Sequence, residues 1–266
     1  MGKVQRSIIV VKIGGSTLGN HDTTMEDLVA LQKEGRTLVV VHGGANIVSE
    51  WLSRMRISTR FENGLRVTDR QSLDVVAAVL CGLVNKELVI GIQSLGGRAI
   101  GLSGVDGGFI EARIKNAELG YVGEVVKVNP EPIEAILKGG YIPIIAPLGF
   151  GVKGEKAEKL NVNGDPAAGD IAAALEAERL IFLTDVPGIL DSSGKLLPRL
   201  SADEASSLIG SGVVSGGMIP KVEACLRALS TVPITQIVDG REPHALLQAM
   251  AGKGDGTTIV LTGRME

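Results

Sequence analysis

Two glycine turns, each directly after a short apolar run, are the first residues in this sequence that could do chemistry. Lys12–Ser16 (KIGGS) follows the first run, and His42–Asn46 (HGGAN) follows the second. Glycine lets backbone N–H groups approach a ligand without a Cβ atom in the way, and the start of a following helix favours negative charge. The turns predict a phosphate site with Lys12 as its cation. Taken alone, Lys12 could equally be a lysine that extends to solvent beside a tight turn.

His42 invites a role as general base. A histidine at the end of a strand is more often a hydrogen-bonded scaffold residue, and we expect a structural role.

Two later segments place polar residues at the starts of predicted helices. Asn161–Gly169 (NVNGDPAAG) brings two amides and Asp165 before a helix of small residues. Asp165 followed by proline is also typical of a helix N-cap, which leaves a capping role as the alternative. Lys221 lies in the first turn of another helix, where a cation opposes the helix dipole. This position calls for a nearby anion, unless the lysine is simply exposed to solvent.

Conventional nucleotide signatures are missing from these turns. Neither has the G-x-G-x-x-G order of dinucleotide-binding proteins, and no G-x-x-x-x-G-K-[ST] motif occurs in the chain. A nicotinamide oxidoreductase is therefore not expected. A kinase would have to hold phosphates with lysines and backbone amides from several loops. The turn Thr184–Leu190 (TDVPGIL) follows another apolar run and is either a site for adenine or ribose or an ordinary turn.

The elements that must position these residues alternate between strand and helix. Val- and Ile-rich runs without polar alternation indicate strands covered on both faces. We therefore predict an α/β protein, a three-layer α/β/α sandwich with an open, mainly parallel central sheet, whose strand ends form the ligand crevice. The expected strands are Ser7–Ile13, Arg36–Val41, Arg98–Leu102, Tyr141–Pro147, Arg179–Thr184, Pro233–Val238 and Thr257–Leu261. The expected helices are Thr24–Lys33, Asn46–Met55, Asp69–Leu95, Pro130–Lys138, Pro166–Ala177, Ala202–Ile209, Ile219–Ser230 and Pro243–Met250.

Three segments depart from this alternation. Ile110–Val128 is typical of a β-hairpin appended to the sheet, which could cover a substrate. Gly151–Lys159 and Asp191–Lys195 are charged and contain glycine, which predicts surface loops. We predict one domain, with a lobe boundary near Pro147–Asn161 that separates an N-terminal lobe (about 1–150) from a C-terminal lobe (about 151–266).

Composition narrows the class of protein. With 266 residues, 44% of them hydrophobic and 21% charged, the chain is typical of soluble globular proteins. A net charge of −3 with one Trp, two Tyr and four Phe offers neither the basic surface nor the stacking platform of a nucleic-acid binder. Cys81 and Cys225 lie in apolar stretches, which predicts two buried thiols and a reducing compartment.

The sequence also lacks a signal peptide pattern and an uninterrupted apolar run of membrane-spanning length. We expect a cytoplasmic protein that binds neither nucleic acid nor a membrane.

Taken together, the segments resemble the amino acid kinase family, and within it the members that phosphorylate N-acetyl-L-glutamate. The resemblance covers nearly the whole chain, in order and in spacing. It implies the amino acid kinase fold and an ATP-dependent transfer to a carboxylate. The segments that carry it are Lys12–Ser16, His42–Gly44, Asn63–Asp69 (NGLRVTD), Leu83–Lys86, Gly101–Gly104, Tyr121–Val125, Asn161–Asp165, Thr184–Leu190 and Gly217–Lys221.

The resemblance also implies roles for residues. Lys12 and Lys221 would stabilise the transition state from opposite sides, and Asp165 would orient both. The acceptor would be held by Gly43, Gly44, Arg66 and Asn161, with Asn163 beside them. ATP, which brings Mg²⁺ with it, would be held by Gly14, Gly15, Asp185, Val186, Pro187, Gly188, Ile189, Leu190, Val213, Val214 and Ser215.

Alternatives remain within and beyond this family. The chain could be a kinase for carrier-protein-linked aminoadipate or glutamate, or a non-catalytic module that senses an amino acid or a nucleotide. Arg66 in its Gly-Leu-Arg-Val-Thr setting favours the free acetyl amino acid. Retention of both lysines and of Asp165 favours catalysis over sensing.

Some positions depart from the family. Ala45 stands where a third glycine is common, and Gly164 stands where alanine is usual. Members inhibited by arginine carry an extra helix before the first strand, whereas eleven residues precede Lys12 here. We therefore expect a homodimer with little or no arginine inhibition, although Gly240–Thr258 is similar to the same segment of inhibited members. A regulatory protein partner is not indicated.

Overall fold

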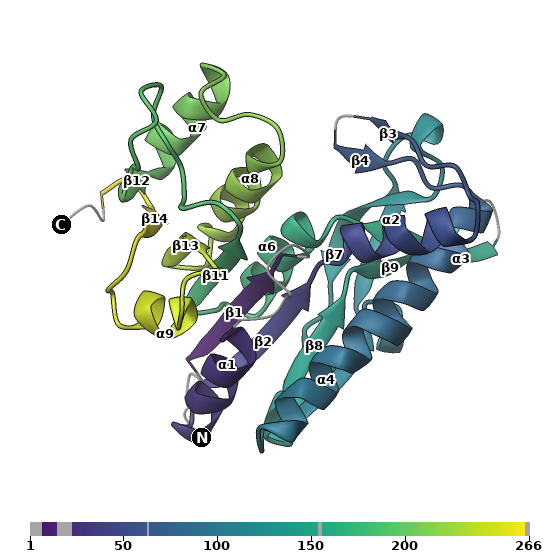
Figure 1. The fold of residues 1–266 in the computed structure, drawn as a ribbon, viewed down its shortest axis with the longest axis horizontal. Coiled ribbons are helices and arrows are strands. Elements are labelled where there is room, and N and C mark those ends of the chain that lie inside the picture. The colour runs from purple at the N-terminus through teal and green to yellow at the C-terminus, as the bar shows by residue number, and fades with distance from the viewer. Residues whose placement is uncertain (1–6, 15–22, 63, 154–155, 264–266) are drawn as a thin grey trace.

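The computed structural model describes residues 7–14, 23–62, 64–153 and 156–263, and its largest element is an eight-stranded sheet (Figure 1). All neighbouring strands are parallel except β13 and β14. The predicted open, mainly parallel sheet is confirmed, with every expected strand present and one short strand, β12, in addition. In spatial order the strands are β12 (Arg199–Ser201), β14 (Gly256–Val260), β13 (Ile234–Asp239), β11 (Arg179–Thr184), β1 (Ile8–Ile13), β2 (Thr37–His42), β8 (Ile142–Ala146) and β5 (Ala99–Ser103).

Helices cover both faces of this sheet, as a three-layer sandwich requires. Successive strand residues point to opposite faces, so Val10 of β1 enters one hydrophobic cluster while Ile9 and Val11 enter the other. On the Val10 face lie α5 (Glu131–Lys138), α6 (Gly164–Ala174), α7 (Ala202–Gly210) and α8 (Met218–Ala228). On the opposite face lie α1 (Thr24–Lys33), α2 (Ala45–Arg54), α3 (Arg70–Ala77), α4 (Asn85–Ser94) and α9 (Ala245–Met250).

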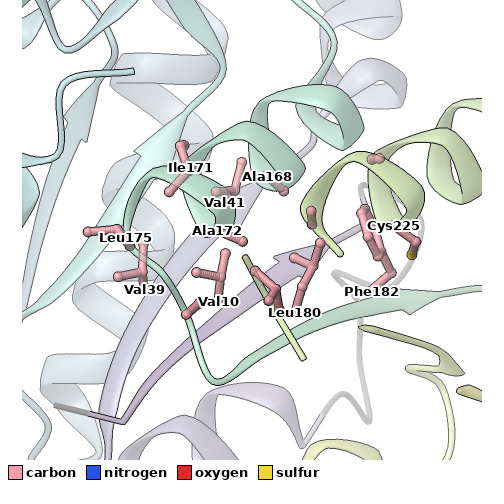
Figure 2. Close-up of a cluster of buried hydrophobic side chains, with 14 of the residues drawn as sticks. Val10, Val39, Val41, Ala168, Ile171, Ala172, Leu175, Leu180, Phe182 and Cys225 are labelled. Atoms are coloured by element: carbon pink, nitrogen blue, oxygen red, sulfur yellow. The ribbon is translucent and has the colours of Figure 1, made fainter. Parts of the chain in front are cut away.

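Small residues bring α6 close to both the sheet and α8. Figure 2 shows Ala168 and Ala172 of α6 over Val10 of β1. On the side of α6 that faces α8, a Cβ atom added to Gly169 would lie 2.8 Å from the carbonyl oxygen of Ala224. The two helices therefore pack backbone against backbone, and this contact sets the relative position of their N-termini.

A second, smaller sheet lies beside the large one. The strands β6 (Ile110–Ile114) and β7 (Val122–Val128) form the predicted antiparallel hairpin. The expectation that it is appended to the large sheet is wrong, because β6 and β7 pair with β9 (Leu148–Lys153) and β10 (Lys156–Val162) in a closed barrel of four strands. The structure also contains a short antiparallel hairpin that the sequence did not predict. Its strands, β3 (Phe61–Glu62) and β4 (Leu65–Arg66), have two residues each.

The two predicted surface loops have different outcomes. Gly151–Lys159 is not a loop, since it falls within the β9–β10 hairpin. Two of its charged residues form ion pairs with helix α3, namely Lys159 with Asp74 at 2.7 Å and Glu158 with Arg70 at 2.5 Å. Asp191–Lys195 is a turn, as predicted, in which the Asp191 carboxylate accepts hydrogen bonds from two backbone N–H groups.

One long helical stretch, Arg70–Ser94, crosses a face of the sheet. It consists of α3, a π-helix at Ala78–Val84 and α4, and it matches the helix predicted over Asp69–Leu95. Within the described residues, this stretch of 25 residues is long and apolar enough to span a membrane by length and composition. Val84 and Ile92 are among its residues that pack in the core against the sheet, so we interpret it as a core helix.

The cysteines follow the prediction in part. Cys225 is fully buried, and burial raises the pKa of its thiol to about 12. Cys81 is partly exposed, which differs from the expected burial.

Candidate active site

A cavity of about 420 Å³ opens where the carboxyl ends of β1 and β2 meet the start of several helices. Gly44 and Ala45 at the start of α2, Asp165 in α6 and Lys221 in α8 all line it. Neither α2 nor α8 has a side-chain cap on its first N–H groups. Uncapped helix N-termini carry a partial positive charge and unsatisfied donors. The cavity is therefore suited to anions.

Lys12 and Lys221 meet at one carboxylate in this cavity. The Lys12 Nζ atom lies 2.5 Å from Asp165 Oδ1, and the Lys221 Nζ atom lies 3.0 Å from Asp165 Oδ2. Lys221 also donates to the carbonyl oxygen of Gly217 at 3.2 Å. Its side chain is only 18% exposed, so the alternative of a solvent-exposed surface lysine is wrong.

Asp165 is held in its ionised form by these lysines. Burial alone would raise the pKa of its carboxyl, but the attraction of Lys12 and then of Lys221 outweighs burial and lowers the pKa below its ordinary value. A charged carboxylate between two ammonium groups holds both in place. It also leaves their remaining N–H donors for other anions.

The capping role proposed as the alternative for Asp165 belongs to Asn163. The Asn163 Oδ1 atom accepts a hydrogen bond from the Asp165 backbone N–H at 3.0 Å, and Asn163 is the N-cap of α6. Asp165 lies inside the first turn instead, with its side chain on the two lysines. Asn163 also lines the cavity.

Arg66 contributes a second cationic group from the β3–β4 hairpin. Its Nη2 atom donates to the Ala45 carbonyl oxygen at 3.0 Å and to Ser49 Oγ at 2.6 Å, and the guanidinium lies over the Phe61 ring at 4.6 Å. Within the described chain, its buried Nη1 atom has no hydrogen-bond partner. Burial lowers the pKa of Arg66, which marks a desolvated guanidinium. An open donor on a desolvated guanidinium suits a carboxylate ligand.

The other residues predicted to hold the acceptor also line the cavity. Asn161 donates through Nδ2 to Thr68 Oγ1 at 3.1 Å. The Gly43 N–H donates to the Ile13 carbonyl oxygen at 2.9 Å, whereas the Gly44 N–H has no acceptor in the described part of the chain. Gly44 has a φ of 150°, in the region that favours glycine. The Gly44 amide is thus a donor available to a ligand.

The residues predicted to hold ATP are less closely gathered. Asp185 lines the cavity, while the Gly14 N–H donates to the Leu183 carbonyl oxygen and Gly15 lies outside the described residues. Ile189 and Val214 are buried in the core. Pro187 lines a separate hollow of about 170 Å³. The remaining members of the set, which do not line the cavity, are Val186, Gly188, Leu190, Val213 and Ser215.

His42 is a buried neutral scaffold residue, as expected. Burial lowers its pKa to about 4. Its Nδ1 atom donates to the Gly43 carbonyl oxygen at 2.7 Å, and its Nε2 atom accepts from Asn85 Nδ2 at 3.2 Å. Asn85 was given no role from the sequence, although it lies in the Leu83–Lys86 segment that resembles the family. The signal that could have found it is an amide that directly follows the apolar run Val75–Val84.

Both family departures fit this geometry. Ala45 is the first residue of α2, a helical position that alanine occupies without strain. At Gly164 an added Cβ atom would meet its nearest neighbour, the His42 carbonyl oxygen, at 3.5 Å, which is ordinary contact. The missing methyl group at position 164 therefore leaves the site intact.

The chain matches a known protein family over most of its length. A model described as "Amino acid kinase family" matches residues 7–237. The chain belongs to the amino acid kinase family. Membership in this kinase family implies ATP as the phosphoryl donor.

Individual relatives place the chain within the amino acid kinase family. An acetylglutamate kinase from Dehalococcoides mccartyi is 45% identical over 262 residues, which cover 97% of this chain and 96% of the relative. An acetylglutamate kinase from Parasynechococcus marenigrum is 46% identical over 96% of this chain and 89% of its own length. The crystal structure of smu.665 from Streptococcus mutans is 30% identical, with a TM-score of 0.84 over 97% of this chain and all of that chain.

Proposed function

We propose that this protein is an acetylglutamate kinase of arginine biosynthesis, which transfers the γ-phosphoryl group of ATP to the γ-carboxylate of N-acetyl-L-glutamate. The products are N-acetylglutamyl 5-phosphate and ADP. The observation that carries the proposal is the pair of lysines on one buried carboxylate, in a cavity that Arg66 also lines. The full-length similarity to acetylglutamate kinases supports the choice of acceptor.

The chemistry requires positioning and charge neutralisation. A γ-carboxylate has a pKa of about 4.3, so the nucleophile is ionised at neutral pH and needs no general base. The neutral, buried His42 is consistent with this reaction. The enzyme must bring two anions into line and stabilise the charge on the transferred oxygens.

The cavity residues divide this task. Arg66 and Asn161 would bind the α-carboxylate and the amide of the acceptor, with Gly43, Gly44 and Asn163 close by. The ammonium groups of Lys12 and Lys221 would contact the transferred phosphoryl group, and Asp165 would keep them in position. The acceptor would bind on the N-terminal side of the cavity. ATP would bind on the C-terminal side, where Asp185 lines the cavity and the rest of Asp185–Leu190 and Val213–Ser215 lie outside it.

Mg²⁺ is expected to enter with ATP, bound to the phosphates. Within the described residues no group of three or more acidic, histidine or cysteine side chains could hold a metal ion. Of the two aspartates that line the cavity, Asp165 is already engaged by two lysines. The described residues thus fit a metal ion that arrives bound to the nucleotide, and they do not form a separate set of metal ligands.

An acyl-phosphate trap tests the proposal directly. The purified protein is incubated with ATP, Mg²⁺ and hydroxylamine, which converts an acyl phosphate to a hydroxamate. Hydroxamate should form with N-acetyl-L-glutamate and not with carrier-protein-linked aminoadipate or glutamate. Formation only with a carrier-linked acceptor would replace the proposed substrate, and no turnover with either would favour the sensing module.

Assembly and location stay predictions. We expect a cytoplasmic protein that forms a homodimer. Light scattering of the purified protein measures the mass of the assembly. A hexamer, or inhibition by arginine at physiological concentration, would contradict that expectation.

A further inference from the structure

The π-helix at Ala78–Val84 lies directly beneath the glycine turn that opens the cavity. It interrupts the long helical stretch between α3 and α4. π-Helical segments are rare, are less favourable than α-helix and are frequent at functional sites. Three residues contact the turn His42–Gly44, namely Leu80 and Val84 within the π-helix and Asn85 directly after it.

The apolar contacts are with Gly44. A Cβ atom added to Gly44 would lie 2.7 Å from Leu80 Cδ2 and 3.4 Å from Val84 Cγ2. Leu80 and Val84 are buried, and Leu80 also lines the cavity. The Gly44 backbone therefore rests on these side chains. The Gly44 N–H is the donor for which no described residue provides an acceptor.

The polar contact is with the residue before the glycines. Asn85 is fully buried, and its Nδ2 atom lies 3.2 Å from His42 Nε2 and 2.8 Å from the Ile144 carbonyl oxygen. It thus connects the end of β2 to the middle of β8. His42 in turn donates to the Gly43 carbonyl oxygen. The turn is held from below by packing at Gly44 and by a hydrogen-bond chain at His42.

The winding of the π-helix brings these contacts to one side. In an α-helix with 3.6 residues per turn, residues five apart are rotated by about 140° from each other. A π-helix closes its hydrogen bonds over five residues, so Leu80 and Asn85 lie about one turn apart on the same side. Continuous α-helix would direct one of the two away from the turn.

We infer that the π-helix is a positioning device for phosphoryl transfer, in which Leu80, Val84 and Asn85 hold the Gly44 amide toward the reacting carboxylate. The inference rests on the proposed function. None of the three is a catalytic residue, since each acts through the turn. An alternative is that they are ordinary core residues whose loss affects stability alone.

Matched substitutions on the same helix separate these readings. Leu80→Ala is compared with Leu88→Ala, a buried leucine of the same core cluster that does not line the cavity. If Leu80→Ala fails to fold, a second pair replaces the first. Val84→Ala, which removes less volume, is then compared with Val79→Ala, another buried valine of the same core cluster. Leu80→Met keeps the volume and serves as the rescue. Melting temperature, kcat and KM for N-acetyl-L-glutamate are measured well below the unfolding transition.

We expect the members of each pair to lose similar stability. Removal of one oxyanion donor typically costs 100- to 1,000-fold in kcat, and partial displacement should cost about tenfold or more. Leu80→Ala should therefore lose at least about tenfold in kcat relative to Leu88→Ala with KM little changed, and Leu80→Met should recover it. Equal kcat values within the pair, or a loss confined to KM, would overturn the inference. An inactive wild type would instead refute the proposed function.

Discussion

The ammonium group of Lys221 lies 3.0 Å from the carboxylate of Asp165, across the gap between two helix N-termini. Each residue is in the first turn of its own helix, and the helices meet at Gly169 and Ala224. The positive charge of Lys221, which is unfavourable at the start of α8, is thus compensated by the Asp165 carboxylate at the start of α6. The same arrangement leaves Lys221 beside the cavity.

Lys221→Ala should reduce kcat by about 100- to 1,000-fold, because it removes a cation from the transferred phosphoryl group. The hydroxamate assay measures the loss. Lys138→Ala, in the last turn of α5, removes an exposed lysine and should leave kcat unchanged. Unchanged turnover of Lys221→Ala would remove this lysine from the mechanism.

Asp165→Asn should both inactivate and destabilise the protein. It leaves Lys12 and Lys221 without their buried counter-charge, which typically costs roughly 3–5 kcal/mol. Because the pKa of Asp165 is lowered by folding, its charge stabilises the native state above the ordinary value of 3.8, and this contribution is lost as the pH falls through the native pKa. Urea unfolding of wild type and variant should converge toward acid pH. A constant difference between them would contradict the account.

Arg66→Lys should raise KM for the acceptor, because an ammonium group cannot reproduce the forked hydrogen bonds of a guanidinium. The Phe61 contact and the bond to Ala45 would also be weakened. Steady-state kinetics with each substrate varied in turn check this. Arg60→Lys, at an exposed position on the same segment, is the control. An increase in KM for ATP alone would argue against acceptor binding by Arg66.

His42 should make the protein less stable as the pH falls from 6.5 to about 4. Its native pKa of about 4 lies below the ordinary 6.5, so the unfolded chain takes up a proton first. The loss approaches roughly 3 kcal/mol at the acid end of this window. His42→Gln should flatten this part of the pH dependence in urea unfolding.

His244 provides the control for that experiment. The pKa of His244 is raised, mainly by a hydrogen bond to Asp27 and then by the negative charge of Asp27. Its contribution is therefore fully present below pH 6.5 and is lost as the pH rises through the native pKa. His244→Gln should leave the slope between pH 6.5 and 4 unchanged. An equal flattening by both variants would show that the slope has another origin.

Gly169→Ala should destabilise the protein and lower kcat together. The added Cβ atom would lie 2.8 Å from the Ala224 carbonyl oxygen, so α6 and α8 must separate. Overpacking of this kind typically costs about 1–3 kcal/mol, and it displaces Asp165 relative to Lys221. Gly210→Ala, where an added Cβ atom meets nothing within 4 Å, should be neutral or slightly stabilising. Melting temperature and kcat for both variants test the contact.

Local patterns were sufficient to predict most of the large sheet. Runs such as Arg179–Thr184 are buried on both faces, so their composition alone marks them as strands. β12 has three residues, too few to produce a pattern. The sequence indicated that β6 and β7 pair with each other, because they form a hairpin. It did not indicate the barrel, because the partner strands β9 and β10 overlap the segment Gly151–Lys159, whose charged residues and glycines predicted a loop.

The candidate site was foreseen unevenly for a similar reason. Lys221 at a helix start indicated a nearby anion, and glycine turns indicated phosphates. That the anion is Asp165 depends on the packing of α6 on α8, for which Gly169 gives only a faint signal. The π-helical winding has no local signature, since Ala78–Val84 is as apolar as a core α-helix. Asn85 was therefore given no role from the sequence, although it lies in the Leu83–Lys86 segment that resembles the family.

The position of β1 in the sheet has a consequence for synthesis on the ribosome. β1 carries Lys12 and pairs with β2 on one side and with β11 on the other. β2 follows soon after β1, but β11 is made only after more than half of the chain has emerged. Until β11 is synthesised, one edge of β1 lacks the strand with which it pairs in the folded protein.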